Sequence, residues 1–193
     1  MDWSAINPVI FLASIMVAST PILLAALGEM VVEKTGVLNL GVEGMMITGA
    51  VCGFVVAVNT SSPTLGYIGA ALGGAVLALL FGIITQFFLS NQVASGLGLT
   101  LFGLGLSALI GQDYVGIKAP PISDFNIPGL ADLPVLGPIF FQHDLMVYFS
   151  ILLVAAVCAV LKYTRIGLIT RAGGESHDAA HALAYQAVPI RLA

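Results

Sequence analysis

Long apolar stretches, separated by short polar breaks, run through most of the chain. No Asp, Glu, Lys or Arg occurs from Gly44 to Gln112, and polar clusters at residues 59–63 and 90–92 divide this stretch into three parts. A helix needs about 20 apolar residues to cross a bilayer, so each part is long enough to span one. With the apolar stretches on either side, the pattern predicts five spans, near residues 6–28, 37–58, 64–89, 93–112 and 145–161.

These spans are expected to be helical. None alternates between polar and apolar residues, as the short strands of a membrane β-barrel would, and a backbone in lipid must satisfy its own hydrogen bonds. Composition agrees, because 59% of the residues are hydrophobic and 8% are charged, against about 25% charged in a soluble domain. We therefore predict an all-α, polytopic membrane protein with about five transmembrane helices. Such a composition excludes a soluble enzyme, a nucleic-acid binder and a disordered chain.

The basic residues predict an orientation. Four of the six follow the fifth span: Lys162, Arg165, Arg171 and Arg191. Because short cytoplasmic loops carry an excess of Lys and Arg, residues 162–193 are expected inside the cell. Counting back places segment 29–36 inside and the N-terminus outside. Residues 113–144, which contain five prolines and four aspartates, become a rigid, mostly irregular outer loop.

Small residues at spacing four form a row on each of three spans. The rows are Gly49, Gly53 and Ala57, then Ala70, Gly74, Ala78 and Gly82, then Gly103, Ser107 and Gly111. Membrane helices approach one another closely through such faces, so the rows predict helix packing. The alternative is that the same faces line a transport pathway.

A few polar residues stand out against the apolar background. Glu43 follows Asn39 in a glycine-rich segment, where a carboxylate either faces a cavity within the membrane or reaches water at the cytoplasmic interface. Asn91 and Gln92 form either a tight turn or a polar lining at the inner end of a pathway. For each of these two pairs, the two interpretations remain open.

Other polar residues predict no chemistry. His143 and Asp144 are expected at an interface, with no nucleophile or second acid nearby. His177 and His181 are four residues apart, but no third ligand is evident, so a solvated helix face is preferred to a metal site. Cys52 and Cys158 are interpreted as buried small side chains. No metal, cofactor or disulfide is expected.

The predicted cytoplasmic tail contains a candidate docking helix. Ser176 can cap a helix beginning at His177, and Gly173–Gly174 is expected to break the chain just before it. A helix of small residues lets a soluble partner approach closely.

This tail resembles the coupling loop of ABC-importer permeases, in which a short helix contacts the ATPase. The pattern T-x-x-G-L-x-x-R-A-x-G-E-x-x-x-A-A-x-A-L-G is matched by Thr164, Gly167, Leu168, Arg171, Ala172, Gly174, Glu175, Ala179, Ala180, Ala182 and Leu183. Position 184 is Ala where the pattern has Gly. Segment 28–46 is similar to the N-terminal motif of the branched-chain amino acid/ribose type superfamily, in its simple-sugar and nucleoside branch. Family members continue with further spans, so the chain is expected to be a C-terminally truncated, partial permease.

The resemblance implies a single permease domain over residues 1–193, with an outer loop at 113–144 and a cytoplasmic coupling region at 162–193. It implies a non-enzymatic, multi-pass subunit of a bacterial inner membrane, working in a nucleoside or simple-sugar importer. The implied partners are ABC ATPase subunits, which hydrolyse the ATP, a second permease subunit in a heterodimer, and an external substrate-binding lipoprotein.

The resemblance also implies site residues. The ATPase-coupling residues would be Arg171, Gly174, Glu175, Ala179 and Ala180, and the weaker pathway or gate residues would be Asn39, Glu43, Asn91 and Gln92. Two alternatives are an ATP-independent channel or secondary carrier that uses Glu43, and an intramembrane enzyme that uses His143 and Asp144.

Overall fold

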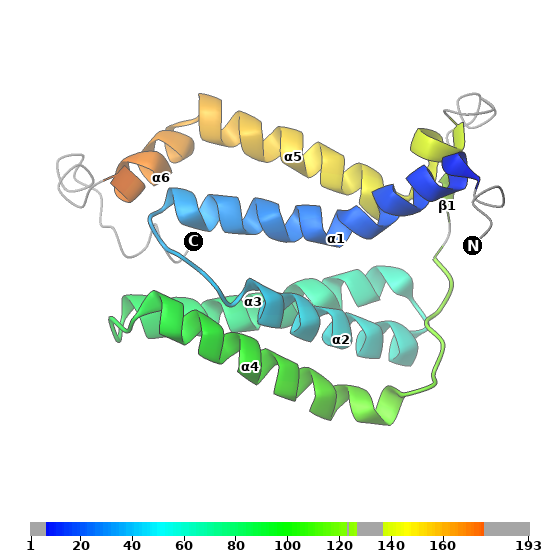
Figure 1. Cartoon of the computed structure of the whole chain (residues 1–193), viewed down its shortest axis with the longest axis horizontal. Coiled ribbons are helices and arrows are strands. Elements are labelled where there is room, and N and C mark those ends of the chain that lie inside the picture. Colours follow the sequence, from blue (N-terminus) through cyan, green and yellow to red (C-terminus); the bar gives the residue numbers. More distant parts are fainter. Residues whose placement is uncertain (1–6, 123, 127–136, 176–193) are drawn as a thin grey trace. The chain divides into compact units, whose positions relative to one another are not determined.

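A computed structural model describes residues 7–122, 124–126 and 137–175. The described α-helices are α1 (Pro8–Lys34), α2 (Val42–Thr60), α3 (Pro63–Gln86), α4 (Gln92–Gly111), α5 (Leu145–Tyr163) and α6 (Arg165–Glu175). A short 3-10 helix (Gln112–Tyr114) and a π-helix (Gly137–Phe141) are also described. Within the described part, α1 to α5 are long and apolar enough to cross a membrane. The prediction of an all-α protein with five spans is confirmed (Figure 1).

Two spans have ends that differ from the prediction. α1 continues six residues past Gly28, because Glu29, Glu33 and Lys34 mark the edge of the apolar stretch without disfavouring helix. α1 instead ends where Gly36 adopts a left-handed φ of 81°, a conformation that costs glycine little and commonly ends helices. α2 then begins at Val42, so residues 35–41 form no helix.

The chain divides into two compact units. One contains residues up to Gly28 together with Ile122–Tyr163, and the other contains Glu29–Pro121 together with the chain from Thr164 onward. We call them the α5 unit and the α3 unit.

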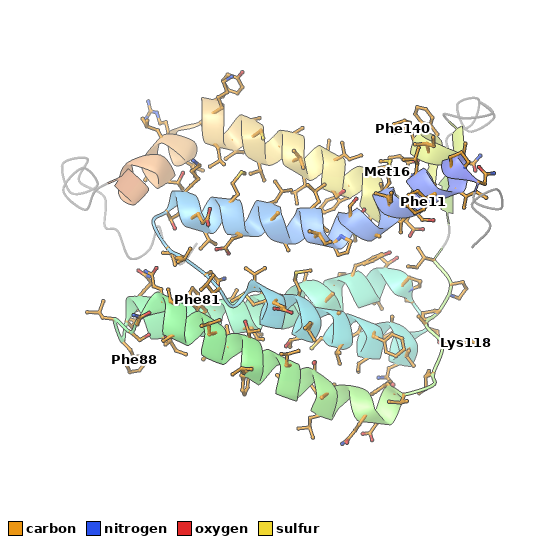
Figure 2. All side chains as sticks on the ribbon, in the orientation of Figure 1. Phe11, Met16, Phe81, Phe88, Lys118 and Phe140 are labelled. Atoms are coloured by element: carbon orange, nitrogen blue, oxygen red, sulfur yellow. The ribbon has the colours of Figure 1, made fainter. Side chains whose placement is uncertain are left out.

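The α5 unit contains most of α1, a small hairpin and α5. Pro21 lies inside α1, where it cannot donate the usual backbone hydrogen bond. The strands β1 (Asp124–Asn126) and β2 (Gln142–Asp144) pair in antiparallel register, with Phe125 opposite His143. Figure 2 shows the labelled side chains of Phe11 and Phe140 at the end of this unit where the hairpin lies. The sequence predicted irregular structure for this loop and missed the strands.

The α3 unit is built around α2, α3 and α4, which lie side by side (Figure 1). Glycines make this approach possible. A Cβ on Gly103 would lie 2.6 Å from the carbonyl oxygen of Gly44, and one on Gly66 would lie 2.7 Å from the Cβ of Ala57. Both distances are shorter than atoms tolerate, so these positions accept only glycine at the present helix spacing. Helix packing through small residues is therefore confirmed for α2 and for the Gly103 end of the α4 row.

The row predicted on α3 is only partly correct. The residues of α3 that meet α2 most closely are Gly66, Gly69, Ala70 and Gly73. Gly74 has only one atom near its Cβ position, the carbonyl oxygen of Met45 at 3.7 Å. Residues three and four apart share a helix face, and spacing four alone selected a row that drifts away from the true contact.

α6 contradicts the expected chain break. Gly173 and Gly174 lie inside this helix, which continues to Glu175. Glycine costs a helix roughly 1 kcal/mol relative to Ala, and that cost is small enough for a tertiary contact to offset. The helix predicted from His177 lies outside the described residues.

Candidate functional site

The segment Thr35–Gly41 links α1 to α2 and is called the connector here. Its burial alternates: Thr35, Val37, Asn39 and Gly41 are buried, whereas Gly36, Leu38 and Leu40 are exposed. This period of two is the mark of an extended chain. The connector therefore presents one side to the interior of the α3 unit.

Side chains from two helices hold the connector in place. The backbone N–H of Leu38 donates to Gln92 Oε1 at 2.8 Å, and the Thr100 hydroxyl donates to the carbonyl oxygen of Leu40 at 3.0 Å. From the other side, Glu29 Oε1 accepts from the Asn39 N–H at 3.1 Å. Non-helical backbone in a membrane protein needs such partners. These bonds explain how the connector can remain extended between two spanning helices.

Asn39 organises the end of the connector. It is 7% exposed, and its Oδ1 accepts from the Gly41 N–H at 2.9 Å, forming a turn that leads into α2. Its Nδ2 donates to the sulfur of Met45 at 3.6 Å, a long and weak contact. The second hydrogen of this amide has no acceptor among the described residues.

An open cavity of about 440 Å³ lies between the connector, the end of α1 and α3. Ten residues line it: Val32, Val37, Asn39, Ala75, Ala78, Leu79, Phe81, Gly82, Thr85 and Gln86. Its size is within the range of small-molecule sites, about 300–1,000 Å³. Ala78 and Gly82, which the sequence placed in a packing row, therefore line a cavity.

The polar residues of the cavity are buried. Thr85 is 4% exposed and Gln86 is 9% exposed, and both belong to the last turn of α3. The Thr85 hydroxyl donates to the carbonyl oxygen of Phe81 at 2.9 Å, which leaves its oxygen able to accept. Gln86 Nε2 reaches Thr85 Oγ1 only at 3.5 Å. Figure 2 labels Phe81, whose side chain belongs to the buried core beside the cavity.

α6 contacts the start of the connector. A Cβ on Gly174 would lie 2.5 Å from the carbonyl oxygen of Lys34 and 3.2 Å from the backbone nitrogen of Gly36. Glycine is therefore required where α6 meets the turn that ends α1. Of the other predicted coupling residues, Arg171 and Glu175 lie in α6, and Ala179 and Ala180 lie outside the described residues.

The remaining predicted pathway residues have different surroundings. The side chain of Asn91 caps α4 by accepting from the N–H groups of Val93 and Ala94. Glu43 is exposed in the first turn of α2, where a negative charge interacts favourably with the helix dipole. Neither residue lines the cavity. Gln92 does not line it either, but it holds the connector, which does, through its hydrogen bond with Leu38.

The structure also shows the surroundings of His143, Cys52 and Cys158, for which the sequence predicted no chemical role. His143 is 3% exposed, and its Nε2 bonds the carbonyl oxygen of Ile139 at 2.7 Å, so it is buried in the small hairpin. Cys158 is exposed on α5, which corrects the expectation of burial, and Cys52 is half-buried. No group of three or more His, Cys, Asp or Glu side chains in the described ranges could hold a metal ion.

Sequence reasoning missed four residues of this site: Glu29, Thr85, Gln86 and Thr100. Thr85 and Gln86 were absorbed into the apolar span predicted near 64–89, although two adjacent polar residues in a span are a signal in themselves. Glu29 and Thr100 form hydrogen bonds with the connector backbone, and no residue pattern indicates such bonds.

Comparison with known proteins assigns the class of this helical membrane protein. Residues 11–193 match the family described as "Branched-chain amino acid transport system / permease component". The chain belongs to this permease family.

Named relatives are also permeases. The chain is 42% identical to the "Putative glucose ABC transporter permease protein TsgC13" of Haloferax volcanii, over 84% of this chain and 51% of that protein. It is 32% identical to the guanosine ABC transporter permease protein NupQ of Bacillus subtilis, over 94% and 61%. It is 30% identical to the nucleoside ABC transporter permease protein NupC of Lactococcus lactis, over 95% and 62%.

The chain thus spans between about half and three fifths of the length of these relatives. No solved structure matches it.

Proposed function

We propose that this chain is the membrane subunit of an ATP-driven importer for nucleosides or simple sugars. Family membership and relatives named for glucose, guanosine and nucleoside transport support this proposal. The chain itself is a multi-pass, non-enzymatic permease component. ATP hydrolysis belongs to separate ATPase subunits, a second permease subunit completes the pathway in a heterodimer, and an external lipoprotein delivers the substrate.

The observation that carries the proposal is the contact between α6 and the connector. The permease motif runs through α6, and its glycine, Gly174, lies against Lys34 and Gly36. The connector in turn forms a wall of the cavity through Val37 and Asn39. Movement of α6 by an ATPase docked on region 162–193 would therefore shift the connector and change the cavity, which is how ligand-driven steps switch packed helices. Arg171, Glu175, Ala179 and Ala180 supply the docking surface in this proposal.

The proposed orientation is consistent with this mechanism. Within the α3 unit, α6 and Phe88, which lies just beyond α3, are at one end, whereas Lys118 is at the other (Figures 1 and 2). The basic tail and the cavity then share the cytoplasmic end, with the N-terminus and loop 113–144 outside the inner membrane. The pathway or gate comprises Asn39 and Gln92, with Glu43 and Asn91 at the same end.

The first test is association with the ATPase. The full chain is co-expressed with its cognate ABC ATPase and purified from solubilised membranes. We expect Glu175→Arg and Ala180→Trp to abolish ATPase co-purification without reducing membrane insertion.

The same assay tests the role of Gly174. We expect Gly174→Val to retain the ATPase but lose ATP-dependent uptake, because a side chain there would push α6 away from Lys34. Gly98→Val is the matched control, since nothing lies within 4 Å of a Cβ on Gly98. Undiminished co-purification of Glu175→Arg, or uptake that needs no ATPase and stops in Glu43→Gln, would contradict the proposal and favour a channel or carrier.

A further inference from the structure

We propose that the cavity beside the connector binds an intact, uncharged nucleoside, with Asn39, Thr85 and Gln86 as its hydrogen-bonding residues. This inference rests on the proposed import function and names the ligand and its site.

The first step concerns charge. None of the ten lining residues is Asp, Glu, Lys, Arg or His. An ionised group transferred into such surroundings without a partner loses its hydration at a large cost in free energy. The cavity therefore suits a neutral ligand and disfavours a nucleotide, whose phosphate would find no cation there.

The second step concerns the distribution of polarity. Seven of the lining residues are apolar, and five of these belong to α3: Ala75, Ala78, Leu79, Phe81 and Gly82. Thr85 and Gln86 follow in the last turn of this helix. A nucleobase has flat apolar faces and a polar edge, so it can rest on the small residues and direct its edge to the amides. A nucleoside also carries hydroxyls, but they are confined to the ribose, away from the base. A hexose carries hydroxyls around its whole ring, and several of them would be buried against apolar walls without partners.

The third step concerns the polar groups. The carboxamide of Gln86 offers a donor and an acceptor side by side, the arrangement that pairs with the edge of a nucleobase. Asn39, whose Oδ1 already accepts from the Gly41 N–H, adds a donor. Asn39 and Gln86 are both more than nine-tenths buried. Within the described residues, Gln86 has one long contact and Asn39 keeps one amide hydrogen without an acceptor. Buried amides normally have full sets of partners, and a bound nucleoside would complete them.

Thiol labelling of the full chain in membranes tests the assignment directly. In a Cys52→Ala, Cys158→Ser background, Ala78→Cys places a thiol in the cavity, and Val76→Cys places one on an exposed face of the same helix. We expect guanosine to slow maleimide labelling of Ala78→Cys several-fold and to leave Val76→Cys unchanged. Glucose and guanosine monophosphate should protect neither.

A second variant tests whether the Gln86 amide binds the ligand. Gln86→Leu keeps the size of the side chain and removes its hydrogen-bonding groups, so we expect roughly tenfold weaker guanosine protection at Ala78→Cys. Gln112→Leu, an exposed residue beyond α4, is the matched control and should leave the protection unchanged.

Several results would overturn the inference. Labelling of Ala78→Cys that guanosine does not slow excludes a nucleoside in the cavity, and protection by glucose assigns a sugar instead. If Gln86→Leu leaves the guanosine protection of Ala78→Cys unchanged, the Gln86 amide does not bind the nucleoside. These assays need no ATPase, so loss of ATPase association with intact protection would contradict the import mechanism and leave the binding site standing.

Discussion

The two halves of α3 use small residues for opposite purposes. Toward Pro63, Gly66, Gly69 and Gly73 let α2 approach until no side chain can be added. Toward Gln86, Ala78 and Gly82 face an open cavity. Small residues thus produce close packing where a neighbouring backbone is near, and open space where it is not. The neighbouring helix, and not the residue type, decides which of the two occurs.

The largest effect is expected from disturbing the packed region. Gly103→Val should lower the free energy of unfolding by about 3 kcal/mol, because its side chain would overlap the backbone of Gly44 and overpacking typically costs this much. Thermal unfolding of the protein in detergent measures the loss.

Gly105→Val is the control on the same helix, since a Cβ on Gly105 has nothing within 4 Å. Equal stability of the two variants would show that α2 and α4 are not closely packed at Gly103.

An intermediate effect is expected at the connector. Asn39→Ala should lower the free energy of unfolding by about 2 kcal/mol, because the buried N–H of Gly41 loses its acceptor. Proteolysis of the connector should become faster, and gel analysis of timed digests measures it.

Glu43→Gln provides the comparison for this variant. Glu43 is exposed in the first turn of α2, so its replacement should change stability by only about 0.5 kcal/mol. A larger loss in Glu43→Gln than in Asn39→Ala would reverse the assigned roles of the two residues.

The smallest effect on stability is expected in the open half of α3. Ala78→Leu should change the free energy of unfolding by less than about 0.5 kcal/mol, as exposed substitutions usually do. The same variant should lose nucleoside uptake, because its side chain occupies the cavity. Stability and uptake measured on one preparation separate these outcomes, and normal uptake would show that the cavity is not on the transport pathway.

Much of the fold was predictable because lipid imposes a simple rule. Five apolar stretches became five helices. A helix end differs from the predicted end where a charged residue ends the apolar stretch but not the helix, as at Glu29. The candidate site was less predictable. Asn39 was singled out as a polar residue of the pathway or gate, but its partners come from Glu29 and Met45, and only folding brings these residues together.

The sequence by itself determined the class of the protein, its five spans and its family, because hydropathy and local motifs are properties of contiguous residues. Only the tertiary structure decided which small residues pack and which line a cavity, that Asn91 caps a helix, and that Gly174 touches the end of α1. These features depend on atoms that are distant in the chain and meet only when the helices associate. Helix periodicity describes one helix at a time, and it contains no information on the position of the next.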